Sequence, residues 1–175
     1  YGMALFGSTY LLPVYMQLAL QLSPSYVGGI LLPAGLALAV TIGIAGRMAD
    51  QVSCHLLISL GLALLALSFA LILAVTLDSP IWYVIAFTVL GRIGLGFILP
   101  SLNLGAMRGL HKDLIAQGAS TINFIRMLGG SAGVSLCGIV LEWRLAVHGD
   151  NLTRVASSPQ RLAAFNEAFL MLAAL

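Results

Sequence analysis

The stretch CHLLISLGLALLALSFALILAVTL, residues 54–77, decides the fold class of this chain. It contains no Asp, Glu, Lys or Arg, and a helix of about 20 predominantly apolar residues is long enough to cross the hydrocarbon core of a bilayer. Similar apolar runs lie on both sides of it, at 2–22, 25–46, 81–106 and 115–141, with a further run that starts at 160 and reaches 175. The sequence therefore predicts an all-α integral membrane bundle of five complete transmembrane helices plus the start of a sixth, with an outer loop at 142–159.

The composition of the chain agrees with this fold class. Of its 175 residues, 60% are hydrophobic and only 8% are charged, whereas soluble domains carry about 25% charged residues. The net charge of +2 is too small to indicate a nucleic-acid partner. Because neither end of the sequence looks like a natural terminus, we expect residues 1–175 to be a fragment of a longer protein.

The basic residues of the short loops predict the orientation of the bundle. Arg47, Arg108 and Lys112 occur in the second and fourth breaks between apolar runs, while the first and third breaks have no Lys or Arg. Since short cytoplasmic loops are enriched in Lys and Arg, we expect the even-numbered breaks to be cytoplasmic. This places the start of the chain in the cytoplasm and the 142–159 loop on the periplasmic or extracellular side.

The segment NFIRMLGGSAGVSL, residues 123–136, carries a charge inside an apolar run. On a helical wheel, Asn123 and Arg126 share one face with small residues, and apolar side chains lie opposite. Charged side chains in spans turn toward the bundle interior or toward water, so we expect Asn123 and Arg126 to line a cavity. Gly129, Gly130 and Gly133 are expected to allow a neighbouring helix to approach closely.

The fourth and first runs show related patterns. Arg92 and Asn103 share a face of the 81–106 run with Gly96, while Gly94 lies on the far side and is expected to serve a second helix contact. In the 2–22 run, Tyr10 and Gln17 share a face whose aromatic and amide groups suit a pocket for amphipathic molecules. The predicted cavity residues are therefore Tyr10, Gln17, Arg92, Asn103, Asn123 and Arg126.

Structural interpretations of the same residues remain open. Arg92 and Arg126 can snorkel to the membrane interface, Tyr10 can be interfacial, and Gln17 can bond another helix. No Asp or Glu lies inside the five predicted spans. A carboxylate partner for either arginine must therefore come from another part of the protein, from a substrate or from the cytoplasmic edge.

The segment GRMADQ, residues 46–51, closes the second apolar run. Gly46 can end a helix, and Arg47 suits the negative end of the helix dipole. Asp50 can cap the third helix or pair with a basic residue across the loop. These features indicate a helix end. The spacing of Gly46, Arg47 and Asp50 also favours a functional role for this loop.

Several stretches together resemble one family, the EmrB/QacA-type fourteen-span drug:proton antiporters of the major facilitator superfamily, and most closely its EmrB branch. GRMADQ resembles the superfamily's cytoplasmic loop signature at Gly46, Arg47 and Asp50. The other matching stretches are YLLPVYMQ (10–17), GGILLPAG (28–35), GRIGLGFILPSL (91–102), LIAQGAS (114–120), NFIRMLGGSAGVSL (123–136) and LEWRLAVH (141–148). Arg92 and Arg126 match family arginines, whereas Ser53 and His55 replace the glycine and basic residue that usually continue the signature.

The resemblance implies that residues 1–175 form the carboxyl-terminal part of a major facilitator transporter domain. It also implies multidrug efflux by proton antiport across the cytoplasmic (inner) membrane, with no cofactor. Its implied partners are lipophilic small-molecule substrates, the lipid bilayer, the missing amino-terminal half of the same chain, and a periplasmic adaptor with an outer-membrane channel. The family's coupling carboxylates belong to that missing half, so the fragment alone is not expected to transport.

Other functions are less consistent with the sequence. The same fold can export another solute, such as a siderophore, lipid or sugar. A membrane-embedded enzyme or metal site would need its groups at one depth, but the three histidines, His55, His111 and His148, are expected in loops without ligand spacing. A scaffold without transport activity would gain nothing from two arginines buried in the membrane. We therefore expect a transporter rather than an enzyme.

Overall fold

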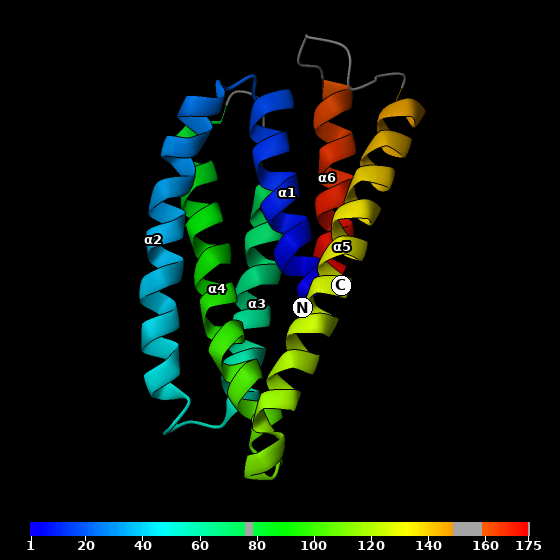
Figure 1. Ribbon diagram of the computed structural model, residues 1–175. Coiled ribbons are helices and arrows are strands. Elements are labelled where there is room, and N and C mark those ends of the chain that lie inside the picture. The colour runs from blue at the N-terminus through cyan, green and yellow to red at the C-terminus, as the bar shows by residue number, and fades with distance from the viewer. Residues whose placement is uncertain (76–78, 149–158, 175) are drawn as a thin grey trace.

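The computed structural model describes residues 1–75, 79–148 and 159–174. The described residues form the α-helices α1 (Gly2–Leu18), α2 (Pro24–Met48), α3 (Cys54–Ile72), α4 (Ile81–Met107), α5 (Ile115–Val147) and α6 (Pro159–Ala174), with a 3₁₀ segment η1 (Lys112–Leu114). Helix direction alternates along the chain, so the 49–53 and 108–114 connections lie at one end of the bundle and the 19–23 connection lies at the other (Figure 1).

The helices confirm the all-α membrane fold class. The helices α2, α3, α4 and α5 are each long and apolar enough to cross a membrane. The helices α1 and α6 are shorter, with 17 and 16 residues. Large apolar side chains such as Leu32, Phe124 and Ile139 are exposed along the outside of the bundle, as expected of side chains that meet lipid rather than water.

Several predicted boundaries were wrong. The helix α1 ends at Leu18, not at 22, because Gln21 adopts a φ of 55° and its side-chain amide donates to the Leu18 carbonyl. The helix α3 ends at Ile72, and residues 76 and 77 of the predicted run lie outside the described residues. The helix α2 continues through Gly46 to Met48, so Gly46 does not end it.

The predicted outer loop at 142–159 was also too long at its start. The helix α5 continues to Val147, so residues 142–147 are helical. The end of this helix is held by an ion pair between Arg144 Nε and Glu167 Oε2 of α6, at 3.0 Å. His148 Nε2 lies 3.6 Å from the other oxygen of Glu167. Residues 149–158 of the predicted loop lie outside the described residues.

Two packed groups of helices make up the bundle. The helix α4 packs along both α2 and α3, while α1 packs mainly along α5, and α6 contacts both α3 and α5. By contrast, α1 and α4 do not pack along each other. The space between α1 and α4 is therefore where side chains can line a cavity.

Glycines set the close approach of α4 to both of its neighbours. A Cβ atom on Gly94 would lie 2.6 Å from the Gly61 carbonyl oxygen of α3, and a Cβ on Gly61 would lie 2.6 Å from the Gly94 carbonyl oxygen. A Cβ on Gly96 would lie 2.6 Å from the Thr41 Cβ of α2. Only residues without a side chain allow backbones to come this close.

A buried arginine joins α6 to the end of α1. Arg161, in the first turn of α6, is 0% exposed, and its Nη1 donates to the Leu18 carbonyl at 3.2 Å. The last carbonyls of a helix lack intrahelical partners and carry the negative end of the dipole. The guanidinium therefore stabilises the end of α1 while fixing α6 beside it.

Candidate solute-binding site

The site begins with the contact between α1 and α5. A Cβ on Gly133 would lie 2.6 Å from the Met3 Cα, and a Cβ on Gly130 would collide with the Phe6 ring. At Gly129, the nearest atom to an added Cβ would be the Met3 nitrogen at 3.6 Å. These glycines lie on the α1-facing side of α5, so the two backbones approach closely there.

This approach places Arg126 beside the start of α1. Gly2 of α1 lies directly against the Arg126 carbonyl. The Tyr1 hydroxyl lies within electrostatic reach of the Arg126 guanidinium, but neither that hydroxyl nor Arg126 Nε makes a well-aligned hydrogen bond. Arg126 is half-buried. The guanidinium thus retains donor capacity that a bound group can use.

A cavity of about 420 Å³ adjoins Arg126 between α1, α4 and α5. Its lining residues are Tyr1, Gly2, Met3, Leu102, Ile122, Ile125, Arg126 and Gly129. Arg126 supplies the only formal charge among these lining residues, and the rest are mostly apolar. Binding pockets for small molecules combine a largely apolar wall with a few polar groups that fix orientation, and this cavity has that composition.

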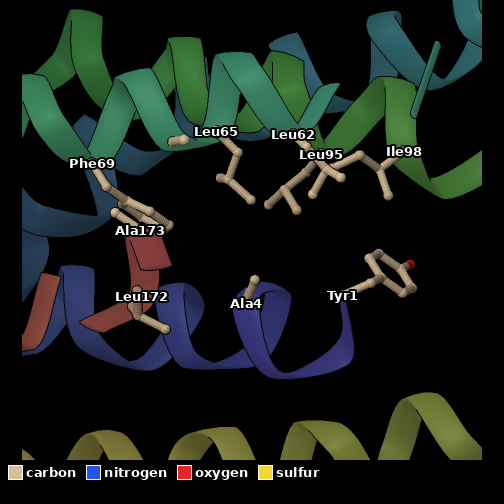
Figure 2. Close-up of a pocket in the computed structure, with 10 residues that line it drawn as sticks. Tyr1, Ala4, Leu62, Leu65, Phe69, Leu95, Ile98, Leu172 and Ala173 are labelled. Atoms are coloured by element: carbon tan, nitrogen blue, oxygen red, sulfur yellow. The ribbon is translucent and has the colours of Figure 1, made fainter. Parts of the chain in front are cut away.

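A second, smaller cavity of about 210 Å³ lies on the other side of Tyr1. Figure 2 shows Tyr1, which precedes α1, and Ala4 of α1 facing Leu62 of α3 and Leu95 and Ile98 of α4 across this space. Leu172 and Ala173 of α6 line it as well. Because no charged residue lines it, this cavity offers a mostly apolar wall.

Arg92 has a partner that the sequence did not indicate. Its Nη1 donates to the Thr9 hydroxyl oxygen of α1 at 3.1 Å. The Thr9 hydroxyl in turn donates to the Leu5 carbonyl at 2.8 Å. Thr9 lies seven residues after Gly2, so both residues lie on nearly the same face of α1. This seven-residue spacing is the sequence feature that could have identified Thr9 as a residue of the site.

The structure does not bring all six predicted cavity residues into one cavity. Arg126 lines the larger cavity. Arg92 of α4 instead contacts α1 further along, at Thr9. Tyr10 is half-buried, with its hydroxyl 4.0 Å from where a Cβ on Gly138 of α5 would lie. The remaining three do not line the described cavities: Gln17 and Asn103 are half-buried, and Asn123 is exposed.

The loop signature is held by a contact from α4 rather than by Asp50. Arg108 Nη2 donates to the Ala49 carbonyl at the end of α2 at 2.6 Å. Arg47 and Asp50 are exposed, and the N-cap of α3 is Ser53 rather than Asp50. Arg108 of the fourth break therefore stabilises the end of α2 through a backbone carbonyl.

The described residues contain no group of three or more His, Cys, Asp or Glu that could hold a metal ion. His55 lies in the first turn of α3 rather than in a loop. Its ring pairs with the hydroxyl of Ser59 in the same helix, at 3.4 Å. His111 pairs with Asp113 at the surface, and His148 lies beside Glu167. The three histidines are thus in separate places.

Residues 1–134 match the Major Facilitator Superfamily. The chain belongs to this superfamily. It is 25% identical over 143 residues to the multidrug transporter protein MdtP of Bacillus subtilis. It is 30% identical over 146 residues to a multidrug resistance protein B homolog of Mycobacterium tuberculosis, and 28% identical over 150 residues to the multidrug export protein EmrB of Haemophilus influenzae.

These alignments cover most of the chain but little of each relative. They include 82%, 82% and 84% of this chain, but only 26%, 27% and 29% of the respective relatives. The chain therefore spans about a quarter of the length of these relatives. As a member of the Major Facilitator Superfamily, it is a multi-pass membrane protein of a transporter family, not an enzyme.

Proposed function

We propose that this chain forms the carboxyl-terminal part of a multidrug efflux transporter that exchanges lipophilic solutes for protons. The carrying observation is the cavity of about 420 Å³ in which Arg126 is the one formal charge on a mostly apolar wall. Such a surface gains affinity from burying apolar area and orients a solute through a single charged group. Relatives whose names refer to multidrug transport, resistance or export support the same proposal.

The site is proposed to be one side of a larger cavity. In transporters of this superfamily, solutes bind near the bilayer midplane between two related bundles, and rocking of the bundles provides alternating access. Arg126 and Arg92 lie within long helices rather than at their ends. The other half of the protein would supply the opposite wall, in the cytoplasmic membrane, with the 49–53 and 108–114 connections in the cytoplasm.

Proton coupling is proposed to depend on groups outside α1–α5. Among the described residues of these five helices, the only carboxylate is Glu142, which is exposed near the end of α5. Glu167 of α6 is engaged with Arg144. A carboxylate that takes up and releases protons during transport would then lie in the other half of the protein. A periplasmic adaptor and an outer-membrane channel are proposed partners of the complete transporter.

Transport by the full-length protein tests this function. Inverted membrane vesicles containing it are expected to accumulate lipophilic dyes, tested as a panel that includes anionic ones, when a pH gradient is imposed, and to stop when the gradient is collapsed. Vesicles with Arg126→Ala protein at equal abundance serve as the control. Failure to move any dye of a broad panel, combined with uptake of a sugar or siderophore, would replace drug efflux with export of that other solute.

A further inference from the structure

The contact between Arg92 and Thr9 joins two helices that are otherwise separated. The helices α1 and α4 do not pack along each other, and both described cavities that touch Tyr1 lie between them. Figure 2 shows this separation at the smaller cavity, where Ala4 and Leu95 face each other across open space. The Arg92–Thr9 hydrogen bond, at 3.1 Å, bridges the same gap further along α1.

The hydrogen bonds of the Thr9 hydroxyl show which group donates and which accepts in the bond to Arg92: Arg92 is the donor and the Thr9 oxygen is the acceptor. A hydroxyl has one proton, and the Thr9 proton is directed to the Leu5 carbonyl. The Thr9 oxygen is therefore left to accept from Arg92, which has only donors to offer. Thr9 is exposed, so a molecule on the open face of the bundle can reach the bond.

The bond to Thr9 uses little of what a guanidinium offers. No Asp or Glu is paired with Arg92 among the described residues. The neutral Thr9 hydroxyl accepts one hydrogen bond from Arg92, whereas a carboxylate can accept two from the planar fork and adds charge attraction. An anionic group would therefore displace Thr9 from Arg92.

The geometry of α1 provides a route for such a group. Arg126 lies beside Gly2, and Thr9 is on nearly the same face of α1, about 10 Å further along the helix axis. The residue Arg126 thus lies beside the start of this face of α1 and lines the larger cavity, and Arg92 of α4 reaches the same face at Thr9. A solute with an apolar body and one anionic group can occupy the cavity at Arg126 and then reach Arg92.

We propose that the Arg92–Thr9 hydrogen bond is a latch between α1 and α4, and that the anionic group of an amphipathic solute opens it. This inference rests on the proposed function and deepens it by naming the charge class of solute to which the helices respond. In the latched state Thr9 holds Arg92. When an anion replaces Thr9, α1 is free to move relative to α4.

Binding to the purified full-length protein tests the latch with two probes of matched shape, 2-naphthoate and 2-naphthylmethylammonium. Thr9→Val removes the acceptor but keeps the side-chain shape, so it should strengthen 2-naphthoate binding by about threefold to tenfold and leave the ammonium probe unchanged. Thr9→Ser keeps the hydroxyl and should bind both probes as the wild type does. Arg92→Gln should weaken 2-naphthoate binding alone.

A distance measurement tests the release itself. Spin labels at exposed Gln21 of the α1–α2 connection and exposed Ala86 of α4 should show a shifted distance distribution when 2-naphthoate binds the wild type. The Thr9→Val protein should show part of that shift without ligand. Equal changes for both probes, or no effect of Thr9→Val on either measurement, would overturn the latch. The absence of any effect of Thr9→Val would indicate that a carboxylate of the protein itself holds Arg92.

These measurements do not require transport. Absence of dye movement under a pH gradient would refute the proposed efflux function, while probe binding and label distances would still decide whether the latch exists. If Thr9→Val protein cannot be purified, Thr9→Ala removes the same acceptor and carries the same expectations.

Discussion

Gly133 of α5 and Met3 of α1 lie so close that a Cβ on Gly133 would come within 2.6 Å of the Met3 Cα and 2.7 Å of its carbonyl oxygen. This contact brings the two backbones together, and it sets the position of Gly2 and Tyr1 beside Arg126. The α1–α5 contact is therefore the structural basis of the candidate solute-binding site.

Gly133→Ala is expected to destabilise the protein by about 1–3 kcal/mol, because backbone atoms of Met3 must move to admit the new methyl group. Thermal unfolding of the purified full-length protein measures this effect. Gly138→Ala on the same helix is the matched control, since a Cβ there would have no neighbour closer than 4.0 Å. Equal melting temperatures for the two variants would contradict the packing role of Gly133.

Gly94→Ala is expected to separate α4 from α3, because its methyl group would lie 2.6 Å from the Gly61 carbonyl and 2.9 Å from the Leu65 nitrogen. We expect a loss of about 1–3 kcal/mol in unfolding free energy. Gly105→Ala provides the comparison, with its nearest neighbour at 3.4 Å. A Gly94→Ala protein as stable as Gly105→Ala would show that the two helices can separate at no cost.

Arg126→Ala in the full-length protein should abolish drug resistance while leaving membrane abundance unchanged, because the cavity would lose its only formal charge. Growth of cells on a drug panel, with protein amounts measured by immunoblot, tests this outcome. Leu128→Ala removes a largely exposed side chain from the same helix and should leave resistance intact. Normal resistance in the Arg126→Ala strain would argue against a role for Arg126 in the cavity.

Arg108→Gln should loosen the last turn of α2, because the Ala49 carbonyl would lose the charged donor that reaches it at 2.6 Å. Hydrogen–deuterium exchange is expected to rise by about five- to tenfold at residues 49–53, corresponding to about 1 kcal/mol or slightly more. Arg47→Gln, a change at an exposed side chain near the same turn, should leave exchange there unchanged. Similar exchange in both variants would mean that Arg108 does not hold the loop.

The ion pair between Arg144 and Glu167 is expected to contribute at most about 1 kcal/mol, because both side chains remain about one-third exposed, at 35% and 34%. A double-mutant cycle with Arg144→Gln and Glu167→Gln in the full-length protein measures the coupling. A coupling of several kcal/mol would instead indicate that the pair is shielded from water in the complete protein.

The sequence by itself determined the fold class and the family. Long runs without charge require helices that satisfy their own backbone hydrogen bonds in lipid, and residues 54–77 form such a run. The small residues of NFIRMLGGSAGVSL indicated where helices approach, because a missing side chain is a local property that the sequence states directly. The end of α1 at Leu18 and the continuation of α5 to Val147 were missed, and both are contacted by α6, through Arg161 at the Leu18 carbonyl and Glu167 at Arg144.

Only the tertiary structure decided which groups meet. The sequence placed Arg92 and Arg126 inside helices, but the angle and depth at which helices pack determine their partners. Packing gave Arg92 a hydroxyl on α1 and gave Arg126 the wall of a cavity with Tyr1. It also directed Arg108 to a backbone carbonyl rather than to Asp50. Such contacts join residues far apart in the chain, so no local pattern specifies them.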